Sequence, residues 1–402
     1  MNRRNLIVLL SVSLIIRLFF IFAVPTTWNS EFDGIQAFND EASHVNYVHY
    51  LISHRSLPVQ KHDVQEPDAF NRNEFEYYQP PLSYILTSLF VLPYVSADDA
   101  FFTYACRIVV CFMGLIGIFL FHQVLLAAGA KDNAFLLTTL YAFLPVHWRH
   151  TSSYSNDALL WIIVIILMYL IRKKLQEDRS IKYLILEGCV LGLGLWTKSS
   201  MITIVCSYII IAFLDHKRWK VWIVPAVTGL LIASPYFFRN AILYHDFLGI
   251  RTSHGPATEG LGSLSIDVVL AFFRGLLGKM VIPFDTLNIP IYLKLPAYMV
   301  YAAAFGLFWV VFFRKSVQIF LSRPICFMTV LSLLIITAWA AFILYNWNQL
   351  QSEFRNIFYC VPIMLVFIDR SVVVNTDWKM TGFISLMLIY PLVLVLLFLS
   401  AG

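Results

Sequence analysis

The sequence predicts an all-α polytopic membrane protein, and its composition and apolar patterning carry that prediction. Hydrophobic residues make up 59% of the 402 positions, charged residues 13%, and the mean hydropathy is +0.73. Soluble domains carry about 25% charged and about 45–50% apolar residues. The composition therefore excludes a soluble enzyme, a disordered chain and a secreted disulfide scaffold. A net charge of +5 suits loops that face anionic lipid and calls for no nucleic-acid partner.

Apolar runs of adequate or near-adequate length recur along the whole chain, since a helix needs roughly 20 apolar residues to cross about 30 Å of hydrocarbon. The first run follows Arg3 and Arg4 and looks like a signal peptide, but its length and the internal Arg17 favour a retained first span. We predict about eleven spans, at 6–24, 101–127, 134–148, 155–171, 182–197, 199–214, 220–238, 296–313, 324–346, 355–370 and 381–400.

One further run, 82–95, decides the topology of everything after it. Its 14 residues include Pro93 and reach about 21 Å as a helix, which is too short to cross. If the run does not cross, sixteen of the 29 basic residues fall on the inner side and eleven on the outer side. If it crosses, the excess lies outside, against the positive-inside rule. We therefore predict an interfacial or re-entrant helix here.

This topology leaves two large outer loops, at 25–100 and 239–295, within a single domain over residues 1–402. The six cysteines all lie inside apolar runs without metal-ligand spacing, so we expect them to be buried small hydrophobic residues. Eleven of the 24 acidic residues fall in the first outer loop. Many of them must be solvated, and the stretch from Asp63 to Glu76 is typical of an exposed polar segment.

Asp40 and Glu41 open a segment, roughly 41–54, whose apolar residues recur at helical spacing. That pattern is typical of a helix at the membrane surface. Asp40 would lie at its N-terminus, either as a capping carboxylate stabilised by the helix dipole or as a general base at the interface. His44, in the first turn, is either a polar surface residue or a contact to substrate.

Two further polar motifs lie at the same outer boundary. Tyr78 and Gln79, which we predict to bind substrate, precede Pro80-Pro81, a pair that fixes an extended turn into the 82–95 run. Asp157 opens the span that follows a polar turn and has the same two interpretations as Asp40, a cap or an active-site carboxylate.

Three cations fall at this boundary too: Lys198, Arg239 and Arg355. Two carboxylates with separate cations suit an anionic lipid head group and a proton-abstracting step. We assign no resident cofactor. A divalent metal between Asp40 and Asp157 stays open, although no HExxH or Cys/His spacing supports one.

At these residues the sequence resembles the GT-C superfamily of polytopic glycosyltransferases that use polyprenyl-phosphate sugars. It is similar to protein O-mannosyltransferases and lipid A aminoarabinose transferases. The resemblance covers about residues 1–250 and is weaker beyond. It rests on Asp40-Glu41, Gln79-Pro80-Pro81-Leu82, Arg107, Asn156-Asp157, the segment from Gly192 to Lys198 and the segment from Pro235 to Asn240.

The resemblance implies a catalytic base at Asp40 and a second active-site acid at Asp157. We predict Glu41, beside Asp40, as a third catalytic residue. It also implies that Lys198 and Arg239 contact the lipid phosphate. Gln79 stands where the family commonly has histidine, so a role of that histidine does not carry over.

We therefore predict a membrane glycosyltransferase that transfers a hexose or pentose from a polyprenyl-phosphate carrier. The acceptor would be a hydroxyl of a glycan, lipid or protein on the outer, periplasmic or extracellular face of a bacterial plasma membrane. Asp40 would act as base, with inversion at the anomeric carbon. The alternatives are a polysaccharide polymerase or ligase and a lipid-linked-sugar transporter, although a transporter usually carries more charges deep in its spans and repeat symmetry.

Overall fold

The computed structural model describes residues 3–24, 26, 40–60, 76–130, 132–176, 180–249, 260–263, 265–281, 291–321, 325–348 and 354–371. This part of the chain is helical and contains no strand. The chain divides into two compact units, whose boundaries fall inside three helices. Unit 1 comprises Met1–Ile16, Leu115–Arg149 and Glu259–Gly402, and unit 2 comprises Arg17–Gly114 and His150–Thr258. A single domain over residues 1–402 stays a prediction.

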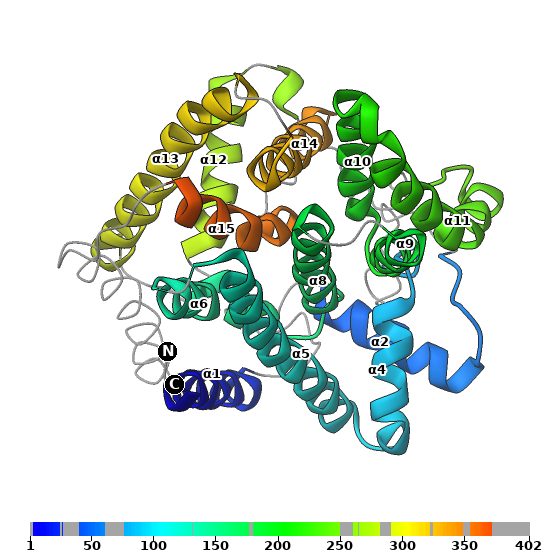
Figure 1. Cartoon of the computed structure of the whole chain (residues 1–402). Helices are drawn as coiled ribbons and strands as arrows, with labels where there is room; N and C mark the ends of the chain where they lie inside the picture. The colour runs from blue at the N-terminus through cyan, green and yellow to red at the C-terminus, as the bar shows by residue number, and fades with distance from the viewer. Residues whose placement is uncertain are drawn as a thin grey trace. The chain divides into compact units, whose positions relative to one another are not determined.

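Unit 2 holds the helices within the first predicted outer loop and the run of helices in the middle of the chain (Figure 1). Its elements are the end of α1 (Arg3–Ala23), α2 (Glu41–His54), α4 (Leu82–Val91), η1 (Leu92–Tyr94), the first half of α5 (Asp99–Ala128), α8 (Asp157–Gln176), α9 (Ile181–Leu195), η2 (Ser199–Met201), α10 (Ile202–Leu214), η3 (His216–Arg218) and α11 (Trp219–Tyr244).

Unit 1 is built largely from the last third of the chain, where α13, α14 and α15 pack on one another. Its remaining elements are the start of α1, the second half of α5, α6 (Ala134–Phe143), α7 (Pro145–His150, whose last residue is in unit 2), η5 (Leu261–Ser263), α12 (Ile266–Val281), α13 (Ile291–Leu321), α14 (Phe327–Asn348), η6 (Phe354–Asn356), η7 (Phe358–Cys360) and α15 (Val361–Ser371).

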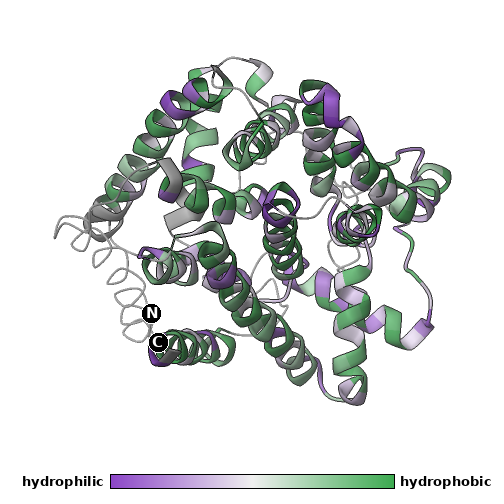
Figure 2. Ribbon diagram, in the orientation of Figure 1, coloured by the Kyte–Doolittle hydropathy of each residue, from purple (hydrophilic) through white to green (hydrophobic). Residues whose placement is uncertain are grey.

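Five helical segments of the described chain are long and apolar enough to cross a membrane: Arg4–Ala23, Asp99–Ala128, His216–Tyr244, Tyr298–Phe320 and Phe327–Trp347. Shorter apolar segments occur at Leu82–Tyr94, Ala134–Phe143, Ser199–Leu214 and Phe358–Asp369. Figure 2 shows hydrophobic residues along most of the length of the helices. The protein is thus a polytopic α-helical membrane protein, while a total of eleven spans stays a prediction. The run at 381–400 lies outside the described residues.

The short run at 82–95 folds as α4 and η1, and its length follows from Pro93. α4 has 10 residues, or about 15 Å of helix, because a proline inside a helix removes a backbone donor and clashes with the preceding turn. Leu92–Tyr94 continues as one turn of 3₁₀-helix. This length agrees with a segment that does not cross, and its placement in the membrane stays a prediction.

α9 and α11 pack closely because α9 carries glycines four residues apart. A Cβ at Gly188 would lie 2.5 Å from Cβ of Thr228, and one at Gly192 would lie 2.7 Å from Cβ of Ile232. Small residues at this spacing let two membrane helices approach each other. The pairing sets the turn at the end of α9 beside the C-terminal half of α11, where Nε1 of Trp196 donates to the carbonyl of Ile232 at 2.8 Å.

The prediction that every cysteine is buried is wrong for half of them. All six are free, and Cys106, Cys111 and Cys360 are buried. Cys189 is half-buried, while Cys206 and Cys326 are exposed. The reason is that the outward face of a membrane helix meets lipid. An apolar side chain there need not pack inside the protein.

Candidate functional site

Asp40 stands directly before α2, and its carboxylate does not cap that helix. Its backbone carbonyl accepts the amide of His44 at 3.1 Å, while its side chain makes no capping hydrogen bond. The capping interpretation is therefore not supported. The side chain is half-buried at the positive end of the helix dipole, which stabilises a carboxylate. The helix ends at His54 and is followed by Arg55, which adopts the left-handed conformation at φ 52°.

Glu41, the next residue, points into the protein and lies in a buried ion pair. Its two carboxylate oxygens accept Nε and Nη2 of Arg107 at 2.8 and 2.6 Å. Oε1 also accepts the backbone amide of Tyr154 at 2.7 Å. The side chains of Arg107 and Glu41 are 0% and 3% exposed. The two neighbouring acids thus have different surroundings, and Glu41 is tied to two distant segments.

His44 is buried, so it is not a polar surface residue. Its Nδ1 lies 2.7 Å from the hydroxyl of Tyr84, and the two rings stack with centroids 5.7 Å apart. The stretch from Asp63 to Glu76 was predicted to be exposed, and this prediction is wrong for its last residue, because Glu76 is 8% exposed. The remainder of that stretch, 63–75, lies outside the described residues.

Among the described residues, one group of three side chains could hold a metal ion: Asp40, His44 and Glu76. Their ligand atoms all lie within 4.8 Å of one another. The donor set fits a divalent cation, because Tyr84 can hold Nδ1 of His44 and so orient the other ring nitrogen as a ligand. A bound cation would add positive charge at this end of α2. This set differs from the predicted pairing of Asp40 with Asp157.

The turn that carries Tyr78 and Gln79 is held by hydrogen bonds to its backbone. The hydroxyl of Tyr47, on α2, donates to the carbonyl of Gln79 at 3.2 Å, and that of Tyr236, on α11, donates to the carbonyl of Tyr78. Burial raises the pKa of Tyr47 well above its usual value, which keeps this hydroxyl protonated and able to donate. The amide of Leu82 donates to the carbonyl of Trp196 at 2.9 Å.

The side chain of Gln79 extends this connection toward the start of α8. Its Nε2 donates to the hydroxyl of Tyr78 at 2.9 Å, and its Oε1 accepts Nδ2 of Asn156 at 3.3 Å. The same amide of Asn156 donates to the carbonyl of Thr197 at 3.2 Å. The Tyr78-Gln79 turn is therefore a junction between α2, α11, the end of α9 and the start of α8.

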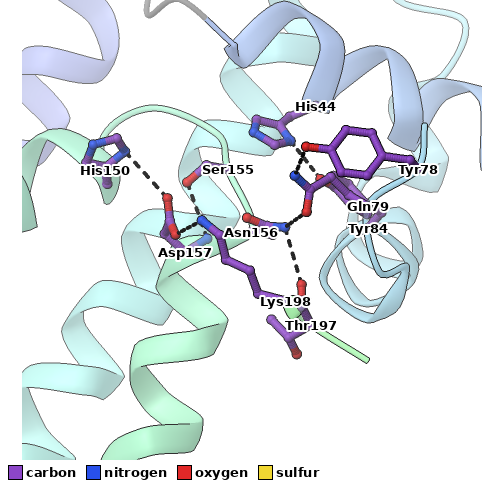
Figure 3. Close-up of polar contacts among 10 residues, drawn as sticks. All are labelled: His44, Tyr78, Gln79, Tyr84, His150, Ser155, Asn156, Asp157, Thr197 and Lys198. Carbon is purple, nitrogen blue, oxygen red and sulfur yellow. Dashed lines mark hydrogen bonds and ion pairs between the residues drawn. The ribbon is translucent and has the colours of Figure 1, made fainter. Parts of the chain in front are cut away.

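Asp157 and Lys198 form an ion pair rather than standing apart (Figure 3). Nζ of Lys198 donates to Oδ1 of Asp157 at 2.5 Å, and Nδ1 of His150 lies 3.9 Å from Oδ2. The Asp157 side chain is 2% exposed and that of Lys198 is 16% exposed. The Lys198 side chain is therefore partly accessible, while its ammonium is held by a buried carboxylate.

Arg239 lies near the C-terminal end of α11 and is half-buried. Its guanidinium donates to the carbonyl of Pro58, in the segment that follows α2. Arg355 lies on η6 in unit 1, so its contribution to this site stays a prediction.

Several residues of this arrangement were not predicted as site residues. Glu76 fell inside a stretch interpreted as solvated, and Tyr84 lies in an apolar run. Arg107 and Asn156 belonged to the quoted motifs without a role of their own. A charged residue inside an apolar run, as at Arg107, was the one available signal, because such a charge needs a buried partner.

The geometry gathers two acidic centres and one cation within unit 2. The first centre is Asp40 with His44 and Glu76, and the second is Asp157 with Lys198. Glu41 and Gln79 connect the two through Tyr154 and Asn156. Such an arrangement can supply a carboxylate base and a cation for a leaving anion.

A known protein family matches the segment of the chain that carries several of these site residues. Residues 79–238 match the family of dolichyl-phosphate-mannose-protein mannosyltransferases. The matched segment begins at Gln79 and includes Asp157 and Lys198. No curated protein gives a significant match.

Solved structures extend the similarity over nearly the whole chain. ArnT from Cupriavidus metallidurans bound to undecaprenyl phosphate matches with a TM-score of 0.56 and 12% identity, over 94% of this chain and 62% of that one. The Archaeoglobus fulgidus oligosaccharyltransferase tethered to an acceptor peptide matches with a TM-score of 0.57 and 13% identity, over 98% and 55%. The chain has the GT-C fold.

A third solved structure also matches over nearly the whole chain. AglB from Archaeoglobus fulgidus, in complex with an inhibitory peptide and a dolichol-phosphate, matches with a TM-score of 0.51 and 13% identity, over 97% of this chain and 55% of that one. The chain thus spans about three fifths of ArnT and about half of the archaeal enzymes. At these identities the similarity establishes the fold.

Proposed function

We propose that this GT-C protein is a membrane glycosyltransferase that takes a sugar from a polyprenyl-phosphate carrier. The acceptor hydroxyl attacks the anomeric carbon, and Asp40 takes its proton. The bond between the anomeric carbon and the phosphate oxygen breaks, and the polyprenyl phosphate leaves. A single displacement inverts the anomeric configuration. General-base assistance of this type contributes about 10²–10⁴-fold to the rate.

The observation that carries this proposal is the connection between Asp40 and the Asp157–Lys198 pair. The start of α2 is joined to the start of α8 through Glu41 and the amide of Tyr154. A base and a cation held on one scaffold suit a reaction in which a proton leaves the acceptor while negative charge develops on phosphate. Lys198, with Arg239, supports the leaving phosphate. Arg355 stays a weaker candidate for the same role.

The fold neighbours support the class of donor and leave the acceptor open. ArnT was solved with undecaprenyl phosphate, and AglB with a dolichol-phosphate and a peptide. A polyprenyl-phosphate-linked sugar is therefore the donor we propose. The acceptor remains a glycan, a lipid or a protein, which would meet the lipid-borne donor at the outer face of a bacterial plasma membrane.

The proposed base lies in the group that could bind a divalent cation, and the two roles are separable. Asp40, His44 and Glu76 would hold the ion, whose charge would favour an anionic donor at this end of α2. Asp40 as a proton acceptor needs no ion. Activity of a metal-depleted preparation distinguishes the two.

The decisive experiment follows sugar transfer in proteoliposomes that contain the purified protein. Undecaprenyl-phosphate-linked radiolabelled hexose or pentose is the donor, and envelope glycans, lipids and proteins are offered as acceptors. Asp40→Asn should abolish transfer while the protein stays folded and inserted. Asp99→Asn, an exposed acid at the start of α5, is the matched control and should retain transfer. Full turnover by Asp40→Asn would overturn the assignment of the base.

The same preparation separates the two alternative functions. A lipid-linked-sugar transporter would move the labelled donor across the bilayer without forming a new glycosidic bond. A polysaccharide polymerase or ligase would build or attach long chains rather than single sugars. Chromatography of the labelled products before and after acid cleavage of the lipid carrier distinguishes all three outcomes.

A further inference from the structure

Arg107 lies on α5 with no exposure to solvent, and its guanidinium makes four hydrogen bonds to residues in the described part of the chain. Two go to the carboxylate of Glu41, as a bidentate pair with Nε and Nη2. The other two go from Nη1 to the carbonyls of Ile21 and Val24, at 2.9 and 2.7 Å. A guanidinium has five N–H donors in a fixed planar fork, so this geometry uses nearly all of them.

The two carbonyls lie at the end of α1, where a helix leaves carbonyl groups without a backbone donor inside the helix. Ile21 is in the last turn of α1, and Val24 directly follows its last residue, Ala23. A cation at a helix C-terminus is also favoured by the helix dipole. Arg107 therefore terminates α1 and binds the start of α2 with the same group.

Glu41 adds a third segment to this junction. Its Oε1 accepts both Arg107 and the amide of Tyr154, residues that lie 66 and 113 positions away in the sequence. Tyr154 stands three positions before Asp157. One carboxylate thus fixes the start of α2, next to Asp40, against the segment that leads to Asp157.

We propose that Glu41 and Arg107 are positioning residues that set Asp40 relative to the Asp157 segment. This inference rests on the proposed function. Glu41 does not act on substrate, because its side chain is 3% exposed and both oxygens are occupied. Asp40 directly precedes α2, so anchoring Glu41 inward also fixes the backbone that carries the Asp40 side chain.

Loss of the anchor should affect the rate more than binding. A misplacement of about 1 Å at a catalytic group costs about 10²-fold in rate. Under the proposed function, in contrast, the donor phosphate is held by Lys198 and Arg239 and not by this ion pair. If the ion pair were purely structural, a variant with packed apolar residues in its place would fold and would keep the kcat of the wild type.

The test is the double variant Glu41→Leu/Arg107→Met, since apolar replacement of both partners of a buried pair is often neutral for stability. We expect the double variant to fold with a lower thermal stability, because the carbonyls of Ile21 and Val24 and the amide of Tyr154 lose these partners. We also expect a fall in kcat of about 10²-fold and a donor KM within about twofold of wild type. The matched control is Lys174→Met/Glu187→Leu. That pair is equally buried, at 0% side-chain exposure for both partners, and Lys174 is separated from Asp157 by about 25 Å of α8. Its kcat should be unchanged.

A second readout needs no turnover. Hydrogen exchange of the amides at 150–157 should be faster in Glu41→Leu/Arg107→Met than in wild type, and unchanged in Asp40→Asn. If the double variant does not fold, Glu41→Gln replaces it with kcat as the readout, because it removes the charge that pairs with Arg107 and keeps an acceptor for the Tyr154 amide. Wild-type kcat in the folded variant, or unchanged exchange in Glu41→Leu/Arg107→Met, would overturn the positioning role. Full activity of Asp40→Asn would instead overturn the proposed function while leaving the exchange result in place.

Discussion

Nζ of Lys198 lies 2.5 Å from Oδ1 of Asp157, so the turn at the end of α9 is joined to the first residue of α8. The carboxylate is buried and the ammonium is partly exposed. Removing either partner therefore leaves the other with an uncompensated charge in a site of low polarity. The two residues should behave as one unit in kinetics.

A double-mutant cycle measures that coupling. We expect Lys198→Met to lower kcat/KM by about 10²–10³-fold, the range found when one donor to a developing anion is removed. Asp157→Asn should have a similar effect because it frees the lysine from its position. The combined variant should fall short of additivity by about 0.5–3 kcal/mol. Additive effects in the transfer assay would show that the residues act independently.

The control for this cycle is Lys220→Met. Lys220 is an exposed lysine near the start of α11, so its replacement removes the same charge without touching the site. Transfer should be within about twofold of wild type. A loss equal to that of Lys198→Met would point to a general charge effect on the membrane-bound donor.

Gln79 should contribute through its connections. Gln79→Ala removes the acceptor for Asn156 and the donor to Tyr78, at a cost of about 1–2 kcal/mol in the free energy of unfolding. We expect kcat/KM to fall about tenfold, because the turn also orients the start of α8. Gln79→His supplies one ring donor and one ring acceptor and should retain more activity than Gln79→Ala. Thermal unfolding and the transfer assay check both effects, and equal activity of the two variants would contradict the connecting role.

Much of the fold could be predicted from local sequence patterns, each of which has a physical cause. The helical periodicity after Asp40 matches α2, and Pro93 explains why α4 ends at Val91. Clusters of apolar residues located the long helices because a membrane helix must be apolar over its length. These features depend on neighbouring residues, which is why they could be read directly from the sequence.

The site itself depended on contacts that the sequence does not encode locally. The pair of Glu41 with Arg107 and the bond from Tyr154 join residues far apart in the chain. Burial of Glu76 could not be inferred from a run of polar neighbours. Asp40 looked equally suited to capping, and the absence of a capping bond depends on backbone geometry. The residue types were therefore predicted, while their partners required the fold.

Metal binding at Asp40, His44 and Glu76 has a readout that does not depend on catalysis. We expect Mn²⁺ or Zn²⁺, added to protein treated with EDTA, to raise the Tm. A ligand at 100 times its Kd stabilises the folded state by about 2.7 kcal/mol. Glu76→Gln removes one charged ligand and should abolish the increase. An equal shift in wild type and Glu76→Gln would show that the ion binds elsewhere.

The buried pair of Lys174 and Glu187 should be important for stability alone. Nζ of Lys174 lies 2.8 Å from Oε1 of Glu187 and 3.9 Å from the centroid of the Trp222 ring. It also donates to the carbonyl of Val221 at 3.4 Å, the group that Pro225 leaves without a helical donor. Lys174→Met should lower the free energy of unfolding by about 3–5 kcal/mol because Glu187 is left buried and unpaired. Lys174→Met/Glu187→Leu should recover most of this loss. Reversible unfolding in detergent measures both, and a stable Lys174→Met variant would show that Glu187 is accommodated without the lysine.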